Sequence, residues 1–293
     1  EESVKSTPNA RAFTQVELLC VLAVALLFLC LLVATFWPVS RPSRGNSGHE
    51  RDYLKLRGIH SAMELWAEQH QGSYPLPSRI DLANTTTREV GSAKNTTSNI
   101  YSVLMFGGYI SFDSVISGSE SNPRISSFES YALEAPPSAV DPGSALWDPA
   151  FTADFTAPGG GHASFAHLQP APSGGRLKNW GQTFAPTTAI VSNRGPEVRL
   201  VVDRGEQSPL VTFVLANSNT LLIHGTRDTW EGHVVYADGH GAFETSVAPD
   251  DRRYLSSSGW RRDVLFYDET DNPNRDNVLL GIFTTAGDSA ANF

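Results

Sequence analysis

The chain has 293 residues and a formal net charge of −9, and 18% of its residues are charged. An acidic balance without a long basic run argues against non-specific binding of nucleic acid, so no nucleic acid is expected as a partner. Few charges and many Gly, Ser, Thr, Asn and Pro residues are typical of a loop-rich extracellular β domain. The two cysteines, Cys20 and Cys30, would lie about 15 Å apart on one helix, which is too far for a disulfide.

Residues 13–37 predict a transmembrane helix. The run from Leu18 to Trp37 contains no charged residue, and a helix of about 20 apolar residues spans the hydrocarbon core of a bilayer. A secretory signal peptide is the alternative, but its apolar core is usually about 7–15 residues long and is followed by small residues. Residues 1–12 are polar and are expected to be a leader or a disordered N-terminal segment.

The segments that follow predict a linker and a second helix. Residues 38–48 are rich in Pro, Ser and Gly, a composition that ends a helix and is typical of a linker. Residues 49–74 predict an amphipathic helix, because apolar residues recur at steps of three and four, at Leu56, Ile59, Met63 and Trp66.

Residues 75–293 are expected to form an extracellular head that is first loop-rich and then β-rich. From Thr187 onward, short β-type runs alternate with turn residues. These runs are TTAIVSN, VRLVVD, PLVTFVLA, TLLIHG, HVVYADGHGAFE, DVLFYDE and NVLLGIFTT. An Asp-Gly pair, Asp238–Gly239, predicts a turn between two strands. The predicted fold class is therefore α+β, with a transmembrane helix, an amphipathic helix and an antiparallel β-rich head.

Four sequence segments resemble known proteins. The segment FTQVELLCVLAVALL, which begins at Phe13, is similar to the processing and assembly motif of type IV pilins and type II secretion pseudopilins. The segments LWAEQHQGSYP, VVYADGHGAFE and RRDVLFYDETDNPNRDNVLL resemble parts of the large pilin-like proteins of planctomycetes. The resemblance implies a pilin-like fold and a structural role, as a subunit of a surface filament or a secretion pseudopilus, and no enzymatic reaction.

The same resemblance assigns roles to residues near the N-terminus. A prepilin peptidase would cut between Ala12 and Phe13, and the new amino terminus would be N-methylated. Glu17 would then pair with that amine on a neighbouring subunit as the helices stack. The resemblance further implies self-association into a helical filament, an inner-membrane location before assembly, a filament on the cell surface afterwards, and partners in the pilus assembly machinery.

Two alternatives remain open from the residues alone. A carboxylate at position 17 also fits the start of a helix, where it meets the positive end of the helix dipole. The whole chain also fits a membrane-anchored adhesion or binding module that does not polymerise. A tethered hydrolase is disfavoured, because the sequence contains no Gly-x-Ser-x-Gly motif around a nucleophilic serine.

Calcium is the candidate cofactor, and the candidate ligands lie in one acidic loop. Hard oxygen ligands of the kind that calcium prefers are supplied by Asp268, Asp271, Asn272, Asn274 and Asp276. A solvated acidic turn is the simpler interpretation of this loop. Zinc is a weaker hypothesis, based on histidines near two aspartates, namely His224, His233 and His240 with Asp228 and Asp238.

Asparagine and tryptophan residues give two further surface hypotheses. Asn84 and Asn95 each begin an Asn-Thr-Thr triplet, which fits the acceptor pattern for N-glycosylation. Four tryptophans could line a sugar-binding face, although packing in the core is the expected use for most of them: Trp147, Trp180, Trp230 and Trp260.

Overall fold

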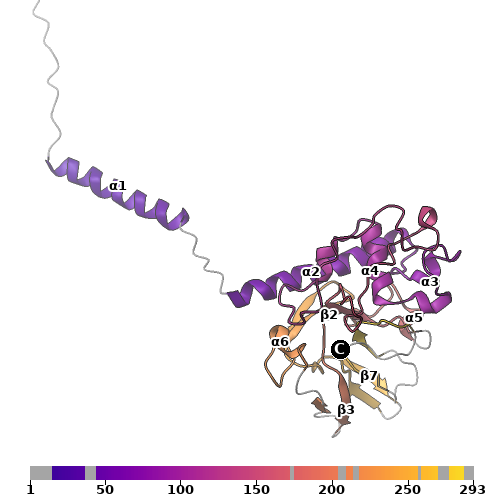
Figure 1. Ribbon diagram of the computed structural model, residues 1–293. Helices are drawn as coiled ribbons and strands as arrows, with labels where there is room; N and C mark the ends of the chain where they lie inside the picture. The colour runs from indigo at the N-terminus through magenta and orange to yellow at the C-terminus, as the bar shows by residue number, and fades with distance from the viewer. Residues whose placement is uncertain are drawn as a thin grey trace, which may run out of the picture. The chain divides into compact units, whose positions relative to one another are not determined.

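Figure 1 shows the fold as a computed structural model, which describes residues 15–36, 44–171, 175–203, 209–213, 218–256, 259–269 and 277–286. The chain divides into two compact units, Glu1–Arg44 and Gly45–Phe293. The second unit is called the head below. Helices and strands together place the chain in the α+β class, as predicted, with one five-stranded antiparallel sheet.

The first unit contains helix α1, Gln15–Phe36, which has 22 residues. Within the part of the chain that the structure describes, no helix combines the length and the hydrophobicity needed to cross a membrane. The predicted transmembrane span of residues 13–37 is therefore not confirmed. Residues 13, 14 and 37 of that span, and the predicted leader at 1–12, lie outside the described residues.

Helix α2, Arg44–Gln69, begins within the segment that was predicted to be a linker and ends five residues before the predicted end. Its apolar side chains Leu56, Ile59 and Met63 are fully buried, as the periodicity predicts, whereas Trp66 is only half-buried. The helix stops where Gln71 and Gly72 adopt left-handed φ angles of +58° and +77°, and the Gly72 N–H donates to the Ala67 carbonyl at 2.8 Å.

The remaining helices are short. Most of them connect loops in the first half of the head. They are α3 (Pro77–Ile80), η1 (Gly91–Lys94), α4 (Thr97–Phe106), η2 (Phe112–Val115), η3 (Pro142–Ser144), α5 (Gly175–Lys178) and α6 (Leu221–His224). The longest of these, α4, begins where the Thr96 side chain accepts a hydrogen bond from the Asn99 N–H.

The main sheet has the strand order β6-β5-β2-β1-β9. Its strands are β1 (Phe165–Leu168), β2 (Ala189–Asn193), β5 (Gly232–Tyr236), β6 (Gly241–Glu244) and β9 (Leu280–Gly281), and all pairs are antiparallel. The turn between β5 and β6 is the predicted Asp238–Gly239 pair, with Gly239 at a φ of +81°. Two separate hairpins pair β3 (Val198–Asp203) with β4 (Pro209–Phe213) and β7 (Arg253–Ser256) with β8 (Gly259–Arg262).

One face of the sheet is covered by α2 and α4 (Figure 1). Phe165, His167 and Asn193 share this face, because Phe165 pairs with Asn193 and alternate residues of a strand point the same way. Asp52 of α2 accepts a hydrogen bond from the Asn193 side chain at 2.9 Å. The hydroxyl of Thr97, at the start of α4, lies 2.9 Å from the His167 ring. The core of the head therefore lies between these helices and the sheet.

Several strand predictions were wrong in detail. The run TLLIHG contains helix α6 instead of a strand, and the run DVLFYDE contains no strand among its residues 263–269. The run NVLLGIFTT is a strand only at Leu280–Gly281. Strand β1 lies in the segment that was expected to be irregular, and β7 and β8 were not predicted.

Candidate functional site

Helix α1 exposes apolar side chains in all directions. Eight large apolar side chains are between 53% and 69% exposed: Val16, Leu18, Leu19, Val21, Leu22, Val24, Leu26 and Phe28. At about 100° of rotation per residue, these positions are distributed around the whole circumference of the helix. A helix that is apolar on every side needs neighbours on every side, whereas a two-stranded coiled coil would cover only one stripe.

The predicted processing and assembly residues lie at the start of this helix. Ala12 and Phe13 are outside the described residues, so the cleavage site stays a prediction. Glu17 is the third residue of α1, and its side chain is outside what the structure describes. Its proposed pairing with a neighbour therefore also stays a prediction.

The head contains a buried polar site around Asp52 of α2. The Asp52 carboxylate accepts hydrogen bonds from the Gly118 N–H at 2.8 Å, from the Asn193 side chain at 2.9 Å and from the Ser117 hydroxyl. The His224 ring also lies 2.9 Å from it, through Nε2. Burial alone would raise the pKa of Asp52, but the hydrogen bonds from His224, Ser117, Gly118 and Asn193 outweigh burial and hold that pKa below its usual range.

Two more histidines surround His224. The His49 ring lies 4.1 Å from the His224 ring, and the His233 ring lies 5.7 Å from it, measured between centroids. Burial and the neighbouring His224 both lower the pKa of His49. The same causes, with His49 added, lower the pKa of His233 to about 4. Burial and the neighbouring imidazole rings therefore disfavour charge on His49 and His233.

This cluster has the wrong geometry for two familiar kinds of chemistry. The Ser117 hydroxyl donates to Asp52 and not to His224, so the chain of contacts needed for a Ser-His-Asp nucleophile is not present in this cluster. Among the described residues, no group of three or more His, Cys, Asp or Glu side chains is arranged to hold a metal ion. The cluster instead connects α2, β2, α6 and β5.

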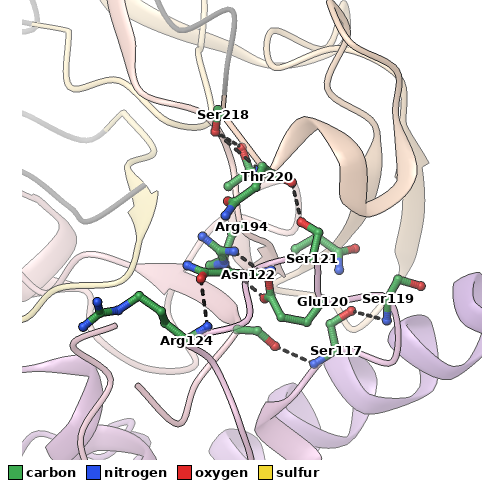
Figure 2. A network of polar contacts seen from close by, with 12 residues as sticks. Ser117, Ser119, Glu120, Ser121, Asn122, Arg124, Arg194, Ser218 and Thr220 are labelled. Atoms are coloured by element: carbon green, nitrogen blue, oxygen red, sulfur yellow. Dashed lines mark hydrogen bonds and ion pairs between the residues drawn. The ribbon is translucent and has the colours of Figure 1, made fainter. Parts of the chain in front are cut away.

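A loop at residues 117–124 carries a network of polar contacts (Figure 2). Glu120 forms an ion pair of 2.6 Å with Arg194, which directly follows β2, and both side chains are almost fully buried. The Ser121 hydroxyl donates to the Asn219 carbonyl at 2.6 Å, just before α6. Because Ser117 and Gly118 of the same loop bind Asp52, this network links the start of α6 to α2.

The structure separates the residues of the zinc hypothesis. His224 and His233 lie together, but their neighbours are Asp52 and His49 instead of Asp228, Asp238 and His240. His240 pairs with Asp238 in the turn after β5 and stacks on Tyr236. Asp52 and His49 were not predicted, because they lie within a helical pattern far from the other members in sequence.

Only one of the five candidate calcium ligands lies in the described part of the chain. The Asp268 carboxylate accepts hydrogen bonds from Arg176 at 3.1 and 3.3 Å and from the Asn277 side chain at 3.1 Å. The other four, Asp271, Asn272, Asn274 and Asp276, are outside the described residues. Calcium binding by this loop therefore stays a prediction.

The two predicted glycosylation sites differ in accessibility. Asn84 is exposed, with a φ of 56°. Asn95 is 3% exposed, and its side chain accepts a hydrogen bond from the Ser78 N–H at 2.9 Å. A sugar on Asn95 would have no room in the folded head, which argues against this site.

The four tryptophans considered for a sugar-binding face also differ. Trp147, Trp180 and Trp230 are buried in the core, as expected for most of them. Trp260, on strand β8, is 58% exposed. It is therefore the one member of this set that is free to contact a ligand.

Comparison with known proteins found no matching family model, no matching curated protein and no matching solved structure.

Proposed function

We propose that this chain is a structural subunit of a type IV pilus-like surface filament or of a secretion pseudopilus, and that it polymerises through α1. The observation that carries the proposal is that the large apolar side chains described between Val16 and Phe28 are exposed on all sides of α1. Burying one such side chain stabilises an assembly by about 1.5–3 kcal/mol. A bundle of α1 helices from several subunits would cover all sides of each helix.

The separation of the chain into two units supports the same function. A filament subunit needs one segment that packs in the filament core and one folded domain on the outside. The division at Arg44 and Gly45 provides such segments. The proposed location is the inner membrane before assembly and the cell-surface filament afterwards, with a prepilin peptidase and the assembly machinery as further partners.

Glu17 gives the experiment that tests this function. An isolated carboxylate in an apolar helix bundle costs at least a few kcal/mol unless it is paired. In the proposed filament, the partner is the amine that is released by cleavage before Phe13 of a neighbouring subunit. Glu17→Ala should therefore reduce assembly without changing the folding of the head.

The test measures filaments in sheared cell-surface fractions by negative-stain electron microscopy, and the mature N-terminus by intact mass. Glu50→Ala is the matched control, because Glu50 is an exposed glutamate of the head. Filaments should be fewer in Glu17→Ala and unchanged in Glu50→Ala. If Glu17→Ala assembles like the wild type, or if the wild type forms no filament, the non-polymerising adhesion module becomes the better interpretation.

A further inference from the structure

We propose that the cavity beside the β7–β8 hairpin binds an acidic saccharide, a sugar residue that carries a carboxylate. The cavity has a volume of about 400 Å³ and lies between the hairpin and the segment that leads from α5 into β2. Pockets for small organic ligands usually have volumes of about 300–1,000 Å³. The proposal concerns the head alone and does not depend on polymerisation.

The hairpin supplies a flat apolar surface at the edge of the cavity. Leu255 and Trp260 form a directly opposed cross-strand pair, and both line the cavity. Leu255 is 51% exposed and Trp260 is 58% exposed. An exposed indole can pack against the face of a sugar ring that carries C–H bonds, because both surfaces are flat and weakly polar.

Three arginines line the cavity, and one of them is exposed to a ligand. Arg176, Arg252 and Arg253 line it, with Asp263 as the only carboxylate among the lining residues. Arg253 is exposed and can reach a ligand, whereas Asp263 is buried and accepts hydrogen bonds from the Val278 N–H at 3.0 and 3.2 Å. Arg176 is paired with Asp268, and Arg252 lies 3.5 Å from the Asp251 carboxylate, so the positive charge offered to an anionic ligand comes from Arg253.

Two of these arginines are buried and keep an unused donor. Arg176 is 1% exposed and Arg252 is 5% exposed, and the Nε–H of each is buried without a hydrogen-bond partner. Their other nitrogens are engaged, by Asp268 and Asn277 for Arg176 and by the Thr187 carbonyl for Arg252. A buried donor without a partner is costly, so a shift of either side chain that brings its Nε–H to an acceptor of the ligand would stabilise the complex.

Polar side chains complete a site that suits a sugar better than a simple anion. Asn179, Thr187 and Thr188 line the same cavity and offer donors and acceptors for hydroxyl groups. A larger cavity of about 760 Å³ lies beside α4. Its one aromatic lining residue, Phe151, is 1% exposed, and it therefore offers no surface on which a sugar ring can stack.

The experiment titrates the full-length chain with three acidic saccharides by isothermal titration calorimetry: trigalacturonate, a hyaluronan tetrasaccharide and N-acetylneuraminic acid. The methyl ester of trigalacturonate and hexaglutamate are the reference compounds. At least one acidic saccharide should bind. The ester should bind at least about tenfold more weakly than trigalacturonate if the latter binds, because a charge-assisted hydrogen bond is worth about 1.5 kcal/mol or more.

Matched variants locate the site. Trp260→Ala and Arg253→Gln should each weaken binding at least about tenfold, since each removes one of the two main contacts. Leu82→Ala and Arg88→Gln remove an exposed apolar side chain and an exposed arginine elsewhere on the head, and should leave binding unchanged. Equal melting temperatures for all four variants would confirm that their folds are intact.

Three results would overturn the proposal. The first is that none of the three saccharides binds up to its solubility limit. The second is that Trp260→Ala and Arg253→Gln bind like the wild type. The third is that a reference compound binds as tightly as the acidic saccharides. Equal binding of hexaglutamate would show that the site recognises negative charge without a sugar. Equal binding of the methyl ester would show that the site does not recognise the carboxylate.

Discussion

At the scale of single residues, His167 is the clearest example of a group whose ionisation is controlled by the fold. The side chain is fully buried on strand β1. Its Nδ1 lies 2.7 Å from the Leu168 carbonyl, which can only accept, so Nδ1 carries the proton and Nε2 accepts from the Thr97 hydroxyl at 2.9 Å. Burial lowers the pKa of His167 to about 4.

This lowered pKa predicts a loss of stability in acid. Between pH 6.5 and 4 the unfolded chain binds a proton at this histidine and the folded head does not, so stability falls as the pH falls through that window. A difference of about 2.5 pH units corresponds to about 3 kcal/mol. The free energy of unfolding in urea should therefore fall by about 2 kcal/mol between pH 7 and pH 4.5, which is most of the full difference.

His167→Gln is the variant that isolates the effect, because glutamine keeps one donor and one acceptor but does not titrate. The decrease between pH 7 and 4.5 should be smaller in this variant than in the wild type. Burial also lowers the pKa of His49 and His233, so part of the decrease will remain. An unchanged pH dependence in His167→Gln would show that His167 does not contribute.

The cluster around Asp52 shows why the sequence could predict only part of the candidate site. His224 and His233 were predicted as candidate zinc ligands because they lie close together in sequence. Asp52 is separated from His224 by 172 residues, and no pattern in α2 distinguishes it from the other charged residues of that helix. Its role depends on four hydrogen-bond donors that converge only after the head has folded.

At the scale of elements, the predictions succeeded where a pattern repeats over several turns. Leu56, Ile59 and Met63 predicted the buried face of α2 because three residues at helical spacing specify one direction. The short run TLLIHG carries no such repeat, and a brief apolar run fits a helix as well as a strand, so α6 was predicted wrongly. Strand β1 was missed because its four residues are all buried and show no alternation.

The exposed side of α2 gives a prediction about helix stability. Gly58 lies within α2 and is exposed, and a Cβ added there would meet no atom within 4 Å. Glycine inside a helix is less favourable than alanine by about 0.5–1 kcal/mol. Gly58→Ala should therefore raise the free energy of unfolding by about this amount, as measured by urea denaturation.

Gly181 is the contrasting position for the same substitution. Its φ is +155°, and an added Cβ would lie 2.0 Å from the Gly72 carbonyl oxygen. Gly181→Ala should therefore destabilise the head, because the backbone after α2 would have to move. If Gly58→Ala instead lowered the free energy of unfolding, the assignment of Gly58 to an exposed position inside α2 would be wrong.

At the scale of the whole molecule, the division at Arg44 predicts that the head folds without the first unit. The unit Gly45–Phe293 contains the sheet and a large hydrophobic core of its own. Deleting residues 1–44 should leave the urea midpoint of the head unchanged and should give a monomer in sedimentation. A large loss of stability would mean that α1 contributes to the core of the head.

The order of strands in the main sheet has a consequence for the time course of folding. Strand β9, near the C-terminus, pairs with β1, and the Phe283 N–H donates to the Thr97 hydroxyl, 186 residues earlier. Contacts between such distant parts of a chain give a high contact order, for which folding takes milliseconds to seconds or longer. Helix α2 is the first helix of the head to be synthesised. Its residue Asp52 can contact His224 only after a further 172 residues have been synthesised. On the ribosome, the head can therefore close only after nearly its whole length has emerged.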